Sequence, residues 1–378
     1  MDEDLTINAA CQNGLCSDCQ MMILYITGDD IVSPACGCAL RSAFLYQALK
    51  QYGEVMVFNP KGVGEGALIR RLFAVPFRKL TKVGRWPFRR RLPQLGGRRW
   101  DAVVIRYLST AAEVAAWQYG PCYVDIDDLP TKAFASVEGR RLPRWMRPFC
   151  AWLVKVWQNY CIRKCAGVWL SNEDDIPLVK GFVRGKVGHL RNIARKPNPN
   201  YKVNGKQDRI LMTVGLMGYV PNAEGVDWFL ENIWAEVHKR WPDLTYVIAG
   251  GGASAEKMAA WSNCPNVKPL GYVENLDGLY ERALAVVAPI LSGAGTSIKV
   301  IEALSHGRVV FATREALRGY SSVTGALIFC SAREFANNLM TWLDMPKDER
   351  ADAQNRIGLQ AMKFSFNKFH VDVASVLL

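Results

Sequence analysis

Histidine is scarce in this sequence, and none of its four copies lies before position 189. A histidine base contributed by the first 188 residues is therefore excluded. Long apolar runs are also missing, since none reaches the roughly 18 residues that cross a bilayer. No charged-then-apolar leader opens the chain, so we expect a protein that is not exported. Acidic residues are too few to balance the basic ones, and the net charge of +12 favours an anionic partner or surface.

The length and composition of the chain fit a globular protein of two domains. The chain has 378 residues, of which half are hydrophobic and 22% are charged. Its 11 cysteines are scattered among apolar residues, as in a reducing compartment. Residues 1–20 have no apolar period, and we expect a loose tail there. Cys16 and Cys19 with Cys36 and Cys38 have roughly the gap of a zinc ribbon, but the second pair is too close together, so we interpret them as free thiols and predict no metal.

From residue 22 onward, apolar runs of strand length alternate with helical patterns. The runs in the first half are MILYIT, EVMVF, AVVIRY, CYVDI, GVWLS and VGHL. After a polar stretch with two prolines the alternation restarts with RILMTVG, LTYVIAG, NVKPLG, ALAVVAPI, RVVFAT and GALIFC. Continuous apolar strands separated by helices predict parallel sheets covered on both faces. The fold class is therefore α/β, with two doubly wound, Rossmann-like domains facing each other across a cleft.

The same pattern sets the expected domain boundaries. We predict a first domain at 21–190, a linker at 191–207 and a second domain at 208–363. A last segment, 364–378, can pack back on the first domain. In doubly wound sheets, ligands bind at the carboxyl ends of the strands. The segments at those ends are rich in glycine, small residues or acids: 28–42 and 125–130 in the first half, and 215–222, 250–256, 271–275 and the stretch 291–307 in the second.

The stretch LSGAGTSIKVIEALSHG, at 291–307, carries the most chemistry. We expect a helix to begin at Thr296 or Ser297, either of which can cap it. Backbone N–H groups and the helix dipole then make an anion site. Lys299 lies in the first turn, and Glu302 lies one turn later, where a carboxylate can accept hydrogen bonds from a ribose. An ordinary capped helix with a surface Lys–Glu pair fits this stretch about equally well.

Two stretches resemble known nucleotide-binding motifs but lack the sequence context that those motifs require. The Gly250-x-Gly252-x-x-Ala255 pattern matches a dinucleotide fingerprint, but it follows the second strand of its domain, and the next acid lies beyond another strand. The stretch GAGTSIK lacks the Gly-Lys-Ser/Thr of a Walker A loop. We therefore predict no dinucleotide cofactor and no P-loop.

The second half, from GLMGYVPN through RVVFAT, resembles the donor-binding half of bacterial group 1 glycosyltransferases, of the family 4 type and GT-B fold. The first half resembles the acceptor-binding half less specifically, through GCALRS, YVDIDDL and WLSNEDD. The resemblance implies transfer of a sugar from a nucleotide-sugar to an acceptor, usually with retention of the anomeric configuration. It also implies that no metal and no cofactor takes part, because helix dipoles and basic side chains hold the diphosphate.

The resemblance also carries site residues over to this chain, one position at a time. Lys299 would face the diphosphate and take part in catalysis, and Glu302 would bind the ribose. The remaining donor-binding positions are Gly37 and Arg41 on the first domain, Gly218 and Asn222 on the first donor loop, Tyr272 and Val273 at the base, and Gly293, Ala294, Gly295, Thr296 and Ser297 at the phosphates and sugar.

Two departures from the family pattern matter. Ala294 stands where the family has the first of two glutamates, so backbone groups of the GAGT run would replace it. The family often has a first-domain histidine at the active site, and here DIDDL occupies the comparable strand end. Asp125, Asp127 and Asp128 are therefore our candidate catalytic residues, which can orient the acceptor or balance an oxocarbenium charge. The alternative is that Asp125 or Asp128 only caps the next helix. These aspartates also resemble a DxD metal motif, but their place in the acceptor half argues against a metal.

Basic residues concentrate in two segments, 70–99 and 140–164, where they alternate with aromatic and apolar side chains. This mixture suits an anionic membrane surface. It would equally suit nucleic acid, but no base-reading motif is present, so we predict no nucleic-acid partner. The alternative is a solvated face with core aromatics. We expect a bacterial enzyme that is cytoplasmic, peripheral on the inner membrane face, and uses a saccharide or polyprenyl-diphosphate-linked acceptor to build envelope or exported polysaccharide.

Two other functions stay open. A nucleotide-sugar epimerase of similar fold would convert its substrate with no acceptor present. A catalytically silent subunit would keep the phosphate loop, bind nucleotide-sugar and turn nothing over. The alanine at position 294, where the family has a glutamate, is the feature that keeps the silent subunit open as an alternative.

Overall fold

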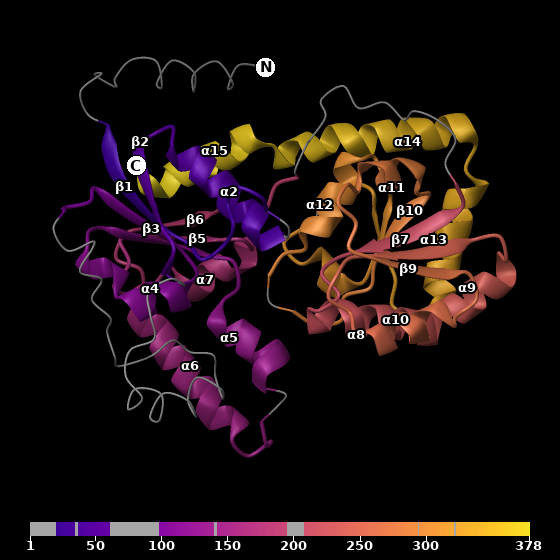
Figure 1. The fold of residues 1–378 in the computed structure, drawn as a ribbon, viewed down its shortest axis with the longest axis horizontal. Helices are drawn as coiled ribbons and strands as arrows, with labels where there is room; N and C mark the ends of the chain where they lie inside the picture. Colours follow the sequence, from indigo (N-terminus) through magenta and orange to yellow (C-terminus); the bar gives the residue numbers. More distant parts are fainter. Residues whose placement is uncertain are drawn as a thin grey trace.

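The computed structural model describes residues 20–34, 37–60, 98–139, 142–194, 208–293, 295–320 and 323–378. In this part of the chain, strands form two parallel six-stranded sheets, one in each half, with helices on both faces (Figure 1). This arrangement confirms the predicted fold class.

The first sheet has the strand order β2-β1-β3-β4-β5-β6, and all of its neighbours are parallel. Each of the apolar runs predicted in the first half becomes one of these strands. Their bounds are β1 (Met21–Ile26), β2 (Gly53–Phe58), β3 (Ala102–Arg106), β4 (Cys122–Ile126), β5 (Gly167–Leu170) and β6 (Lys186–His189).

The second sheet has the order β12-β11-β10-β7-β8-β9 and is also parallel throughout. The apolar runs of the second half again coincide with its strands. They are β7 (Ile210–Val214), β8 (Thr245–Ala249), β9 (Val267–Gly271), β10 (Ala285–Ala288), β11 (Val310–Ala312) and β12 (Ala326–Ile328).

Helices and single turns connect the strands. Those of the first half are α2 (Gly37–Leu49), α4 (Leu108–Val114), η3 (Ala116–Gln118), α5 (Pro130–Ala133), η4 (Phe134–Glu138), α6 (Arg147–Ile162), η6 (Glu173–Asp175) and α7 (Ile176–Val179). Those that follow are α8 (Val220–Phe229), η7 (Leu230–Trp234), α9 (Ala235–Arg240), α10 (Ala255–Ser262), α11 (Asp277–Arg282), α12 (Ile298–Ser305), η8 (Arg314–Leu317), α13 (Ala332–Asp344), α14 (Lys347–Gln360), η9 (Ala361–Phe364) and α15 (Phe366–Leu377).

The strands are buried because helices cover both sheet faces. Every residue of β3, β5 and β10 is buried, which explains why these strands read as unbroken apolar runs rather than as alternating ones. In the second half, Phe229 of α8 packs with Tyr246, Phe329 and Phe335, with ring centroids 4.9 to 6.2 Å apart. Offset and edge-to-face aromatic pairs of this kind contribute beyond their buried area.

The C-terminal helix belongs to the core of the first half. Helix α14 runs along one edge of the molecule and leads to α15, which lies beside α2 (Figure 1). Phe369 and Val373 of α15 are fully buried against the first sheet. The indole N–H of Trp169 on β5 donates to the Asp372 carbonyl at 3.2 Å. The chain therefore crosses between its two halves twice.

In each sheet the strand order reverses at one point, and a doubly wound sheet binds ligands there, beyond the carboxyl ends of the strands. In the first sheet this switch point lies between β1 and β3, and in the second between β7 and β10. The two positions fix where the candidate site must be sought.

Several expectations lie wholly or partly outside the described residues. The tail 1–20 is described only at Gln20, the basic segment 70–99 only from residue 98, and the linker 191–207 only up to residue 194. Ala294, Cys16, Cys19 and Cys36 are also outside. The predicted domain boundaries stay predictions. Among the described cysteines no disulfide forms, and no described helix is long and apolar enough to cross a membrane.

Candidate active site

The loop after β10 brings the start of α12 to the switch point of the second sheet. The helix begins at Ile298, within two residues of the predicted start. Ser297 occupies the N-cap position, but its side chain makes no capping bond, and Thr296 accepts a hydrogen bond from Asn192 instead. The predicted side-chain cap is therefore wrong. Gly293 has a φ of 149°, which a glycine adopts readily and other residues rarely do. The first N–H groups of α12 are thus not taken by a side-chain cap, as an anion site requires.

Lys299 extends from the first turn of α12 toward the loop after β7. Its ammonium donates a 2.6 Å hydrogen bond to Oδ1 of Asn222 on α8. Burial lowers the pKa of Lys299 to about 8, and the nearby carboxylate of Glu302 partly opposes this shift. Because the hydrogen-bond partner is a neutral amide, it does not cancel the positive charge of the buried ammonium, which can still attract an anion. Lys299, Glu302 and Asn222, all predicted for the donor site, lie together.

Two glycine-rich loops, one after β7 and one after β8, form the floor of the site beside Lys299. Gly215, after β7, donates from its N–H to the Ala249 carbonyl, and Met217 donates to the Gly251 carbonyl at 2.8 Å. A Cβ on Gly250 would lie 1.6 Å from the Gly215 carbonyl oxygen, so the close approach of these loops requires glycine. Gly218 packs against the same second loop, where a Cβ would lie 3.1 Å from the Gly252 oxygen.

The predicted base-binding pair borders the same floor. Tyr272, directly after β9, is 66% exposed, and a Cβ on Gly251 would lie 3.4 Å from its Cβ. Val273 is partly buried and packs against the core of the second half. An exposed aromatic ring on an otherwise glycine-lined floor can stack on a planar ring.

On the first half, Asp125 at the end of β4 is a buried counter-ion. Its side chain is fully buried and accepts from Arg41 Nε at 2.8 Å, from Arg41 Nη2 at 2.7 Å and from Arg106 Nη1 at 2.5 Å. Burial alone would raise the pKa of Asp125, but the two guanidinium groups outweigh it and lower that pKa. A carboxylate saturated in this way does not face the cleft.

Arg41 is likewise turned inward. It lies on α2 with 1% exposure, and beyond Asp125 it donates to Asn192 Oδ1 at 2.8 Å and to the Leu190 carbonyl at 2.7 Å. The expectation that Arg41 faces the donor from a glycine-rich loop is corrected by this burial, because all of its named partners belong to the first half. Its role here is to hold Asp125 and Asn192 in place.

Asp127 is placed differently from Asp125, although only two residues separate them. Its side chain is 19% exposed, and Arg106 Nη2 donates to it at 3.3 Å. The same Nη2 donates to the Tyr107 hydroxyl at 3.2 Å. Tyr107 itself has a φ of 70°, a strained value for a residue other than glycine. This strain occurs at the switch point of the first sheet, beside Asp127, where a functional constraint can support it.

Asp128 lies between the two halves. Solvent reaches its carboxylate, but the surrounding protein and the negative charge of Asp127 raise its pKa to about 7, while Arg106 and Arg318 pull it down. A Cβ on Gly295 of the donor loop would lie 2.1 Å from Asp128 Oδ1. Asp128 therefore touches the donor loop directly, and a residue larger than glycine at 295 would require the Asp128 side chain to shift.

The helix starts of the two halves also meet. Gly37 begins α2, and a Cβ there would lie 2.9 Å from Cδ1 of Ile298, the first residue of α12. The first residues of the two helices therefore lie in contact, and the positive dipole end of each helix favours an anion nearby. The structure brings together Gly37, Asp127, Asp128, Asn222, Gly218, Gly293, Gly295, Thr296, Ser297, Lys299 and Glu302, with Tyr272 and Val273 at the border, and it turns Asp125 and Arg41 away.

Three residues of the site were missed at the level of sequence. Arg318 donates to the Gly293 carbonyl at 2.6 Å and pairs with Glu315, so it steadies the donor loop. Arg106 organises the aspartates, and Asn192 joins the two halves. Arg106 and Arg318 follow the general signal that polar residues near the carboxyl ends of β3 and β11 reach the site. Asn192 lay in a stretch that read as linker, and no local signal marks it.

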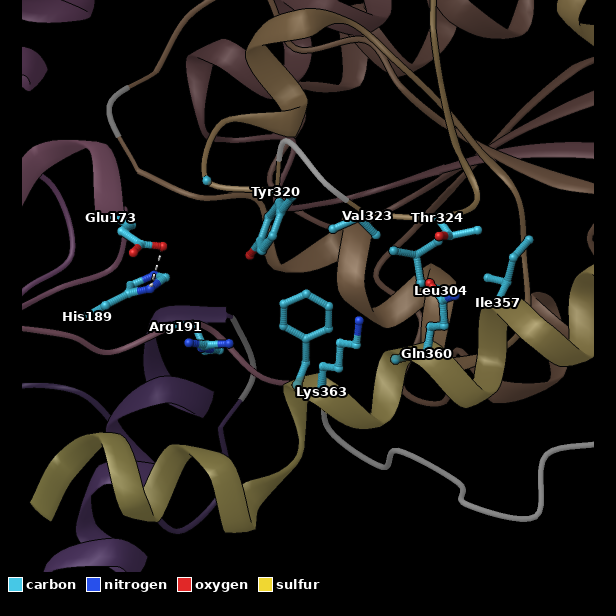
Figure 2. A pocket seen from close by; sticks show the side chains of 13 residues that line it. Glu173, His189, Arg191, Leu304, Tyr320, Val323, Thr324, Ile357, Gln360 and Lys363 are labelled. Carbon is cyan, nitrogen blue, oxygen red and sulfur yellow. Dashed lines mark ion pairs between the residues drawn. The ribbon is translucent and has the colours of Figure 1, made fainter. Parts of the chain in front are cut away.

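A cavity of about 150 Å³ lies between residues of the two halves, apart from the candidate active site. Figure 2 shows His189 and Arg191 of the first half on one side, Val323, Thr324 and Ile357 on the other, and Tyr320 between them. No residue predicted for the site lines it. Gly319 on its wall is close to the donor loop, since a Cβ there would lie 2.5 Å from Thr296 Cγ2.

Within the described ranges, no three histidine, cysteine or acidic side chains lie close enough together to hold a metal ion. The DIDD aspartates diverge instead, because Asp125 points into the core and Asp128 toward Gly295. This geometry does not resemble a site of several convergent oxygens.

Comparison with known proteins finds a family match in the second half. Residues 208–345 match the family model of group 1 glycosyltransferases. A curated protein from Klebsiella pneumoniae, described as an uncharacterized 44.6 kDa protein in a cps region, is 24% identical over 200 residues. That match spans 50% of this chain and 46% of the relative, so the chain aligns with about half of the relative's length.

Solved structures share the whole fold. Sucrose-phosphate synthase from Thermosynechococcus elongatus superposes with a TM-score of 0.66 at 14% identity, covering 94% of this chain and 97% of that one. Trehalose 6-phosphate synthase from Burkholderia multivorans gives 0.63 at 12% identity, covering 95% and 98%. The Anabaena protein HepE, solved with UDP and glucose, gives 0.58 at 12% identity, covering 94% and 99%. The chain therefore has the GT-B fold.

Proposed function

Because residues 208–345 match a group 1 glycosyltransferase domain within a chain of GT-B fold, we propose that this protein is a glycosyltransferase. It moves a sugar from a nucleotide-sugar to a hydroxyl of an acceptor bound in the cleft. The single structural observation that carries the proposal is the contact of Asp128 with Gly295, in the loop that leads into α12 and Lys299.

The second half holds the donor. The diphosphate binds at the N-terminus of α12, where the helix dipole and Lys299 balance its charge. Glu302, one turn along, accepts hydrogen bonds from the ribose hydroxyls, and Tyr272 borders the base. The solved HepE structure contains UDP and glucose, which makes UDP-sugars the first donors to test.

The first half presents the acceptor. In the reaction, the bond between the sugar C1 and the diphosphate oxygen breaks and a bond from C1 to the acceptor oxygen forms. The electron pair of the broken bond goes to the diphosphate, whose negative charge Lys299 stabilises. Asp127 and Asp128 balance the positive charge that develops at C1 and orient the hydroxyl. The resemblance favours retention of configuration, in which the hydroxyl proton passes to the departing diphosphate.

The wider role is also a proposal. A relative from a cps region supports a part in polysaccharide synthesis, with a saccharide or polyprenyl-diphosphate-linked acceptor. We propose that the enzyme uses no metal and no cofactor other than its donor, and that it works in the cytoplasm on the inner membrane face.

A donor screen followed by turnover tests this function. Nucleotide-sugars are first ranked by the thermal stabilisation they give the full chain, since a ligand that binds the native state raises its melting temperature. The best donor is then incubated with and without a lipid-linked saccharide acceptor. Glycosylated acceptor supports the proposal. Conversion of the donor sugar without acceptor identifies an epimerase, and binding with no turnover identifies a silent subunit.

A further inference from the structure

Helix α6 exposes an apolar stripe where a surface helix is expected to be polar. Phe149 is 62% exposed, Trp152 58% and Val156 40%, and Trp145, just before the helix, is 80% exposed. The rings of Phe149 and Trp152 stack with centroids 6.2 Å apart. Single exposed apolar residues are ordinary, but four at spacings of three and four form one continuous strip.

This strip is not part of the packing of α6. The buried residues of the helix are Cys150, Val154, Trp157, Gln158, Cys161 and Ile162. At 100° per residue they centre on the face opposite Phe149, Trp152 and Val156. Helix α6 uses the buried face to contact α4 and α5. It is therefore apolar on two opposite faces, and only one of them has a partner among the described residues.

The charges around the strip have one sign. Residues 142–164 carry five basic residues and no acidic one. Arg144 and Lys155 are exposed and flank the aromatic strip. Tryptophan and phenylalanine bordered by lysine and arginine are the composition of helices that lie in the headgroup region of an anionic bilayer. A second copy of this chain would place like charges opposite each other, so the charge pattern favours lipid.

The strip is also connected to the candidate site. Helix α5 begins two residues after Asp128, and both the N–H and the hydroxyl of Thr131 donate to Gln158 of α6, at 3.1 and 3.0 Å. Figure 1 shows α6 reaching away from the first sheet beside α5. A surface that holds α6 would therefore lie beside the half that presents the acceptor.

We propose that the outer face of α6 is a membrane-docking surface, which inserts Trp145, Phe149 and Trp152 among the headgroups of an anionic bilayer. None of these three residues belongs to the proposed donor site, so the test is independent of the proposed transfer reaction.

The test is sedimentation of the full chain with vesicles. Wild type is mixed with vesicles of phosphatidylcholine alone and with equal parts of phosphatidylglycerol. We expect binding to the mixed vesicles that weakens, but does not vanish, as salt rises. Phe149→Ser/Trp152→Ser should lower the partition coefficient about tenfold or more, because two rings leave the bilayer. The matched control, Leu359→Ser/Val371→Ser, removes two comparably exposed apolar residues from α14 and α15 and should bind as wild type does.

A second pair of variants covers the case in which the aromatic variant does not fold. Arg144→Glu/Lys155→Glu should lose binding to the mixed vesicles, while Lys239→Glu/Lys268→Glu, which makes the same change of charge on the second half, should lose far less. Equal binding by wild type and both α6 variants would overturn the proposal, as would a wild type that ignores phosphatidylglycerol at low salt. Self-association in solution that the aromatic variant abolishes, with vesicle binding unchanged, would identify a second copy as the occupant.

Discussion

Asn192 donates a 2.6 Å hydrogen bond to Thr296 and so ties the donor loop of the second half to the first half. The same amide accepts from Arg41, which in turn holds Asp125. A chain of three contacts thus runs from the buried end of β4 to the loop that begins α12. The position of the donor loop is therefore linked to the buried charges of Arg41 and Asp125.

Breaking this buried network should affect the fold before it affects chemistry. Arg41→Met leaves Asp125 with one guanidinium partner fewer, and loss of one partner from a buried ion pair costs about 3–5 kcal/mol. Asp127→Asn, at a partly exposed position, should change the free energy of unfolding by less than about 1 kcal/mol and should instead lower kcat. Urea denaturation and steady-state kinetics on both variants separate the two roles. Equal stability of Arg41→Met and wild type would contradict the buried-network assignment.

Lys299 should decide donor affinity. A hydrogen bond to a charged group is worth about 1.5–3 kcal/mol, so Lys299→Ala should weaken nucleotide-sugar binding about tenfold or more. Lys268→Ala, at an exposed lysine of the same half, is the matched control. Titration calorimetry measures both. Unchanged affinity in a folded Lys299→Ala protein would remove the lysine from the site.

The pKa of Lys299 predicts how donor binding depends on pH. Burial lowers that pKa to about 8, so the ammonium is charged at pH 7 and loses its proton as the pH rises through 8. Donor affinity should therefore fall above about pH 8. In Lys299→Arg the charge persists throughout this range, and the fall should disappear even if the affinity itself is lower. A fall of the same size in both proteins would assign the dependence to another group.

Asp128 should limit activity at low pH, whereas Lys299 should limit donor binding at high pH. Its pKa is raised to about 7, so the carboxylate is lost as the pH falls below that value. If its negative charge stabilises the developing charge at C1, kcat should decline below about pH 7 and hold above it. Asp128→Asn should lower kcat above about pH 7 to the low-pH level of wild type and so flatten this limb, while Asp174→Asn, an exposed control of the first half, should leave it in place. A limb that survives in Asp128→Asn would show that another group titrates.

Glu302 should make the protein prefer ribonucleotides. If Glu302 accepts hydrogen bonds from both ribose hydroxyls, the protein should bind a 2′-deoxy donor at least about fivefold more weakly than the ribose form. Glu302→Gln should lose most of this preference, and Glu281→Gln, at an exposed acid of the same half, should keep it. Equal binding of the two donors by wild type would leave Glu302 an ordinary helix residue.

The fold was predictable because its signal is local. Most strands of the two sheets, which are three to six residues long, lie in apolar runs with a turn or loop on either side, and burial on both faces makes such runs continuous. The start of α12 was predictable to within two residues for the same reason. The missing cap was not, because Thr296 is bonded across the cleft by a residue 104 positions away.

The failures in the site share one cause. Arg41 meets Asp125 over 84 positions of sequence and Asn192 over 151, and no periodicity records such pairs. From the DIDD motif alone, Asp125 and Asp127 look equivalent, since strand alternation puts both on one face. In the folded protein they differ, because Arg41 of α2 and Arg106 of β3 form ion pairs with Asp125 and neutralise it. The sequence can thus propose which acids lie at a strand end, but not which of them stays available.

The return of α15 to the first sheet has a consequence for dividing the molecule. A fragment that stops at residue 194 would leave Tyr25, Trp169 and Leu45 without the apolar cover that Phe369 and Val373 supply. The two halves are therefore not separable by one cut in the connecting segment. An isolated acceptor half would require the last dozen residues to be spliced onto it or added as a free peptide, and recovery of a cooperative melting transition on adding that peptide would register the docking.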